Sequence, residues 1–100
     1  MLAAEVEGAD DRGLRDLADR LREQIRSGVI VLGTTRGERA LLLATVTRDL
    51  TKRYHAGEII KRIAPLVGGG GGGKPDLAQA GGKNPAKLRA ALEAVYQIVS

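Results

Sequence analysis

The chain has 100 residues, a formal net charge of +4 and no cysteine, and only 2% of its residues are aromatic. We therefore expect one domain with an aliphatic core, and we exclude disulfides, thiolate metal sites and a cysteine nucleophile. No apolar run approaches the ~20 residues of a transmembrane helix, and the acidic N-terminus is unlike a secretory signal, so we expect a cytoplasmic protein without membrane contact.

The first half of the chain predicts a strand, a helix and a β-hairpin. Residues 1–6 suit an edge strand, and Asp10 or Asp11 can cap the helix that follows. Apolar residues then recur every three or four positions, which is typical of a helix with one buried face. This stripe consists of Leu14, Leu17, Ala18, Leu21 and Ile25. The continuous apolar runs 29–33 and 40–47 predict two buried strands of a hairpin.

The second half predicts a helix, a glycine loop, a short strand and a last helix. Residues 56–67 carry another apolar stripe and predict a helix, and the six glycines 68–73 predict a loop. Residues 76–80 predict a short strand that the next glycine pair breaks, and Asn84 followed by Pro85 predicts a capped helix start. The fold class is therefore α/β, a single domain with a small mixed sheet of about four strands flanked by three helices.

The glycine run is the most unusual feature of the sequence. A flexible linker is poorly supported, because the roughly 27 residues after the run cannot fold alone. Ordering glycine costs roughly 0.5–1 kcal/mol more than ordering alanine, so six in a row indicate close backbone contacts or a loop that orders on binding. An ATP-binding P-loop is rejected, because Pro75 stands where Ser or Thr must ligate magnesium. Instead, we expect an anion-binding nest beside Lys74, backed by the positive helix end at Asn84.

The string GGGGGGKPDLAQAGGKNPAKLRAAL resembles the C-terminal motif of alanyl-tRNA synthetases, in which a glycine run leads into K-P-D-x-A-Q-x-G-G. The segments HAGEIIKRIA and LAAEVEGAD resemble the same domain, so the resemblance covers residues 1–100. It implies a fragment of a longer alanine–tRNA ligase, with Met1 an artificial or alternative start. It also implies a non-catalytic module that grips the outer corner of alanine-specific tRNA and links the aminoacylation and editing parts of the parent enzyme.

The chain is also similar to the accessory domain of the DHH phosphoesterases. In that family, a histidine follows the glycine run, and an Ala-Ala-Gly string contacts the nucleotide substrate. Lys74 and Gln79 depart from this pattern, which favours the synthetase branch. A nucleic-acid-binding accessory domain of a phosphoesterase stays open as an alternative. So does self-association of two copies through the aliphatic helix faces, since the resemblance also implies a possible homodimer.

We expect RNA to contact the glycine loop and the cations near it. The predicted RNA-binding residues are Gly70, Gly71, Gly72, Gly73, Lys74, Gln79, Gly81, Gly82, Lys83, Lys52, Arg53 and Tyr54. Residues 1–25 hold seven acids and four bases, whereas residues 26–100 hold twelve bases and five acids. Such a basic excess suits a polyanionic partner and is equally compatible with ordinary solubility.

Several of these residues have an equally open structural explanation. Lys83 is compatible with a solvated surface lysine, and Gln79 with a bond to backbone groups. The group around Lys52, which includes Lys61 and Arg62, is compatible with a charged helix face. Tyr54 is the one candidate for stacking on a base, so phosphate and shape contacts should dominate over base recognition.

We predict no catalytic residue, no metal site and no cofactor. His55 is the sole histidine, and serine occurs only at Ser27 and Ser100. The chain therefore has few residues from which a serine–histidine–aspartate triad could form. We expect His55 to start a helix, with ligand contact as the alternative. The adjacent acids Asp10 and Asp11 are better explained as helix caps than as an acid–base pair.

Overall fold

The computed structural model describes residues 1–99, which form one five-stranded sheet and three α-helices. The strands are β1 (Leu2–Glu5), β2 (Val29–Arg36), β3 (Arg39–Val46), β4 (Gly69–Gly73) and β5 (Leu77–Gly82). The helices are α1 (Asp11–Gln24), α2 (Ala56–Ile63) and α3 (Leu88–Val99), with short 3-10 turns η1 (Arg48–Leu50), η2 (Ala64–Val67) and η3 (Pro85–Lys87). The predicted α/β class is confirmed, with five strands instead of about four.

The strands lie in the order β1-β2-β3-β5-β4. β1 runs parallel to β2, and every other neighbouring pair is antiparallel. α1 is the crossover between the two parallel strands, because a tight turn cannot join parallel neighbours. The predicted hairpin is confirmed, with Val29 opposite Val46 and Arg36 opposite Arg39. The sheet is therefore mixed, and its two edge strands are β1 and β4.

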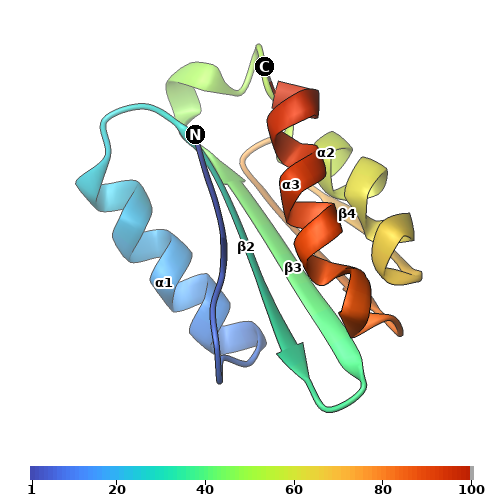
Figure 1. The fold of residues 1–100 in the computed structure, drawn as a ribbon. Helices are drawn as coiled ribbons and strands as arrows, with labels where there is room; N and C mark the ends of the chain where they lie inside the picture. The colour runs from blue at the N-terminus through green and yellow to red at the C-terminus, as the bar shows by residue number, and fades with distance from the viewer. Residues whose placement is uncertain (100) are drawn as a thin grey trace.

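The helices cover both faces of the sheet (Figure 1). α1 packs on one face, with Leu14 and Ala18 buried against β2 and β3. α2 and α3 pack on the other face, where Ile60 and Val95 belong to a larger core. Residues that alternate along β2 and β3 enter different cores, as expected for strands that are buried on both sides. The aliphatic stripes that we considered for pairing two copies are thus largely buried within the domain.

Side-chain caps start two of the three helices. The Asp10 carboxylate accepts a hydrogen bond from the Gly13 amide at 2.7 Å, as predicted for α1. His55 Nδ1 accepts a hydrogen bond from the Glu58 amide at 3.2 Å, so the predicted role of His55 at a helix start is confirmed. The prediction for Asn84 is wrong, because its side chain makes no capping bond and a 3-10 turn precedes α3.

The glycine run is a strand instead of the predicted loop. Gly68 ends η2 with a φ of 70°, a left-handed conformation that glycine adopts without strain. Gly69–Gly73 then pair with β5 along their whole length. Gly81 and Gly82 extend β5 where we predicted that they would break it. Glycine has a low β-propensity, so the pattern gave no sign of a strand that is stabilised by its neighbours.

Candidate nucleic-acid interface

Strand β4 presents backbone without side chains at the edge of the sheet. β5 is its one strand neighbour among residues 1–99. The Lys74 amide donates to the Leu77 carbonyl at 2.9 Å. Because amide directions alternate along an antiparallel strand, the Gly70 and Gly72 amides also face β5, while the Gly71 and Gly73 amides face away from it. A ligand at this edge meets peptide groups directly.

The predicted anion-binding nest is not formed by these glycines. A nest needs successive amides that converge through alternating right-handed and left-handed residues. Among the described residues, positive φ values occur at Gly8, Gly37 and Gly68, none of which lies within β4. The outward amides of a strand instead repeat every second residue, about 7 Å apart. An elongated anionic chain fits this spacing better than a single phosphate does.

The glycines of β4 fall into two alternating classes. A Cβ atom added at Gly73 would lie 2.6 Å from the Leu77 carbonyl oxygen, and one added at Gly71 would lie 2.5 Å from the Ala80 Cβ. An added Cβ at Gly69 would likewise collide with the Gly81 backbone. At Gly70, by contrast, an added Cβ would meet nothing within 4 Å. The fold therefore requires glycine at Gly69, Gly71 and Gly73, whereas the space at the positions between them would accept a larger side chain.

Lys61 is a candidate binding residue that we placed in the basic group around Lys52 but not in the predicted RNA-binding set. A Cβ added at Gly72 would lie 3.5 Å from the Lys61 Cε. The preceding helical turn brings Gly57 against the Gly73 carbonyl oxygen, so α2 runs close along the glycine strand. Lys61 is exposed, and its ion pair with Glu58 is long, at 3.9 Å. This proximity is tertiary, so the spacing of lysines in the sequence did not reveal it.

Lys74 and Lys83 do not converge on one site, contrary to our expectation. Gly73 pairs with Ala78 at one end of the β4–β5 hairpin, and Gly69 pairs with Gly82 at the other. Lys74 follows the first end and Lys83 follows the second. A five-residue strand is about 17 Å long, which separates the two lysines. The strand conformation of the glycines is the reason, because a compact loop would have kept the lysines together.

The structure does bring the predicted group Lys52, Arg53 and Tyr54 to the Lys74 end. The Ala56 and Gly57 amides donate to the carbonyls of Pro75 and Lys74, at 2.8 and 3.2 Å. These bonds fasten the start of α2 to the β4–β5 turn. The Arg53 guanidinium lies 5.6 Å from the centre of the Tyr54 ring. A hollow of about 250 Å³ beside this pair is lined by Arg53, Tyr54, His55, Glu58, Ile59, Arg62, Ile98 and Val99.

The predicted residues of β5 have different surroundings. Gln79 is exposed, although it pairs with the fully buried Leu43 of β3. α1 packs mainly on β2 and β3, so it leaves most of this face of β5 uncovered. Gly81 lies near the Arg39 guanidinium, which a Cβ added at Gly81 would approach to 3.3 Å. Gly82 is buried, and a Cβ there would collide with the Val67 backbone, so the fold itself requires this glycine.

Residues 1–99 contain no cluster of three or more histidine or acidic side chains that could hold a metal ion. Within the same residues, no helix is both long enough and apolar enough to cross a membrane. The structure places peptide groups and the exposed Lys61 and Lys74 at β4, with Arg53 and Tyr54 near its Lys74 end. Such a surface can bind an anionic polymer through its charged backbone.

Comparisons with known proteins identify a family. The DHHA1 domain family matches residues 1–100. The chain is 54% identical to an alanine–tRNA ligase of Anaeromyxobacter dehalogenans over 100% of this chain and 11% of that protein. It is 52% identical to an alanine–tRNA ligase of Desulforamulus reducens over 99% of this chain and 11% of that protein. The chain thus spans about a tenth of the length of these curated relatives.

A solved structure has the same fold. The crystal structure of the C-Ala domain from Aquifex aeolicus alanyl-tRNA synthetase is similar with a TM-score of 0.91 and 32% sequence identity. The similarity covers 99% of this chain and 90% of that chain. The shared fold therefore includes β4 as well as the hairpin and the three helices.

Proposed function

The chain belongs to the DHHA1 domain family, and we propose that it is a non-catalytic module that binds tRNA within an alanine–tRNA ligase. The observation that carries this proposal is the side-chain-free edge of β4 between Lys61 and Lys74. Glycine at Gly70 is not needed to avoid a clash, yet it leaves the peptide groups open to a close approach. The ribose-phosphate backbone of RNA is an elongated anion that suits such an edge.

Lysines beside bare backbone give this edge two kinds of contact. Ammonium groups attract phosphates over several ångströms and release counterions, so binding of this kind weakens steeply with salt. Outward amides donate short-range hydrogen bonds that position the nucleic-acid backbone. Arg53 is exposed and lies over the ring of the half-buried Tyr54, and together they add a surface on which a base stacks. Recognition is therefore mainly by shape and charge, and it needs no cofactor.

In the parent ligase, the module grips the outer corner of alanine-specific tRNA and links the aminoacylation and editing parts of that enzyme, in the cytoplasm. The support is the similarity along the whole chain to the alanine–tRNA ligases described above. The much greater length of those relatives leaves room for both catalytic parts outside this chain.

Titration of tRNA against the 100-residue chain at two salt concentrations tests the proposal. We expect Lys61→Gln with Lys74→Gln to weaken binding about tenfold, because two exposed charge contacts are lost. The slope of log K against log[salt] should become shallower by about 1 to 2. Arg15→Gln with Arg20→Gln is the matched control, since it removes the same charge from the exposed side of α1.

Equal effects of the lysine pair and the control pair would show that the glycine edge is not the binding surface. A chain that does not bind tRNA at either salt concentration would contradict the proposed function itself. Tighter binding of single-stranded DNA than of tRNA would instead favour the accessory domain of a phosphoesterase.

A further inference from the structure

A second basic surface lies where α1 and β3 end, away from the residues that we predicted to bind RNA. A hollow of about 590 Å³ is lined there by Arg22, Ile25, Arg26, Thr47, Arg48 and Asp49. Its three arginines come from three places: the last turn of α1, the connection to β2, and the start of η1. The fold thus brings Arg48 beside two arginines from an earlier part of the chain, and we call this site the arginine hollow.

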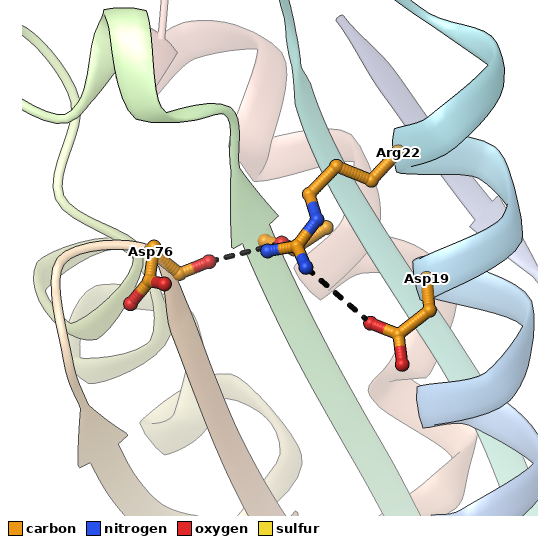
Figure 2. Close-up of polar contacts among 4 residues, drawn as sticks. Asp19, Arg22 and Asp76 are labelled. Atoms are coloured by element: carbon orange, nitrogen blue, oxygen red, sulfur yellow. Dashed lines mark hydrogen bonds and ion pairs between the residues drawn. The ribbon is translucent and has the colours of Figure 1, made fainter.

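Two of these arginines are free to bind an anion. Arg22 has an ion pair with Asp19, at 3.8 Å, and Figure 2 shows its side chain extending from α1 over the sheet. Arg26 and Arg48 are exposed, and neither has an ion pair within residues 1–99. Three cations therefore surround the hollow against one lining carboxylate, that of Asp49.

Asp49 is held in place by its own neighbours. Its carboxylate accepts a hydrogen bond from the Ser27 hydroxyl. Hydrogen bonds from the Ser27 and Thr47 side chains lower the pKa of Asp49 below its usual value of 3.8, so the group is ionised near neutral pH. Within residues 1–99, Asp49 makes no ion pair with Arg26 or Arg48. The local charge stays positive.

The arginine hollow adjoins the Lys74 end of the glycine strand. The Val46 amide and the Thr45 hydroxyl both donate to the Asp76 carbonyl, at 3.0 and 2.9 Å. These bonds join the end of β3, which leads into the hollow, to the β4–β5 turn beside Lys74. β3 and β4 are two strand spacings apart in this sheet, about 10 Å. A nucleic-acid strand on β4 therefore needs only a short path to reach the hollow.

We propose that the arginine hollow binds a phosphate group of the same RNA that lies on β4, so that the RNA continues from the Lys74 end of β4 across the end of the sheet. This inference rests on the proposed function and adds residues that neither our predicted set nor the similarity to relatives assigns. Guanidinium groups suit the role, because their planar donors match two phosphate oxygens at once. The partner is recognised by its phosphates and not by its bases.

The test compares tRNA affinity and its salt dependence for three variants of the 100-residue chain. We expect Arg26→Gln with Arg48→Gln to weaken binding about tenfold and to make the salt slope shallower by about 1 to 2. Asp49→Asn should bind tRNA more tightly than the wild type, because it removes the one lining negative charge. The Arg15→Gln and Arg20→Gln control should leave the slope nearly unchanged. Thermal unfolding of each variant checks that the fold is intact.

The outcomes separate this inference from the proposed function. If the lysine variant loses affinity while the Arg26→Gln and Arg48→Gln variant matches the control, the inference is overturned and the function stands. If the wild type does not bind tRNA, both are overturned. Amide shifts of Thr47 and Arg48 on addition of tRNA, absent in the arginine variant, would support direct contact.

Discussion

At the scale of single residues, the glycines of β4 differ in whether the fold requires them. Gly71 sits so close to β5 that a methyl group would collide with the Gln79 carbonyl oxygen and with Ala80. Gly70 faces open space. Identical neighbours in the sequence therefore differ in how much the fold depends on them, and substitution by alanine can tell them apart.

We expect Gly71→Ala to destabilise the domain by about 1–3 kcal/mol, because overpacking forces β4 away from β5. Gly70→Ala should change stability by less than about 1 kcal/mol, and in the stabilising direction, since alanine has less freedom in the unfolded chain. Gly70→Ala should nevertheless weaken tRNA binding if the backbone of β4 is approached closely. Urea unfolding measures the change in stability, and tRNA titration measures the change in affinity. Equal destabilisation by both variants would show that the fold does not distinguish Gly70 from Gly71.

At the scale of elements, the N-terminal cap of α1 makes stability depend on pH. The hydrogen bond from the Gly13 amide lowers the pKa of Asp10 from its usual 3.8, and the charge of Arg36 acts in the same direction. Because the folded-state pKa lies below the unfolded-state value, this stabilisation is complete above pH 3.8. It is lost as the pH falls through the folded-state pKa.

We therefore expect the stability advantage of the wild type over Asp10→Asn to shrink as the pH falls below about 3.8. Asparagine keeps a capping oxygen that does not titrate, so the comparison cancels the other acidic groups. Urea unfolding of both proteins from about pH 7 to about pH 3 measures the difference. A difference that stays constant over this range would show that Asp10 does not titrate as a cap.

Elements with an apolar pattern could be predicted from the sequence, and those without one could not. The stripe from Leu14 to Ile25 and the run 40–47 correspond closely to α1 and β3. β4 has no side chains and hence no periodicity, so its strand conformation follows only from pairing with β5 and packing by α2. The candidate site was likewise predicted only in part. The sequence pointed to Lys74 and the glycines, but Lys61 comes close to Gly72 only because α2 packs beside β4 in the folded chain.

At the scale of the whole molecule, few large apolar side chains of residues 1–99 are exposed. The large exposed ones are Met1, Leu2, Leu66 and Tyr96. Leu2 pairs with Ile30, whose side chain faces α1, whereas Tyr96 belongs to α3 on the opposite face. Leu66 lies in η2, which contacts α3. Stable self-association needs a large continuous apolar patch, and these four side chains are few for an interface of standard size.

We therefore expect the 100-residue chain to be a monomer that binds tRNA with one-to-one stoichiometry. The aliphatic faces of α1, α2 and α3 are buried in the two cores. The surface that is left for contacts between copies is therefore mainly charged. Two copies of a chain with a net charge of +4 also repel each other at low salt. Sedimentation velocity over a concentration series, with and without tRNA, measures both quantities. A dimer at low micromolar concentration without tRNA would contradict this expectation and would favour an assembly role.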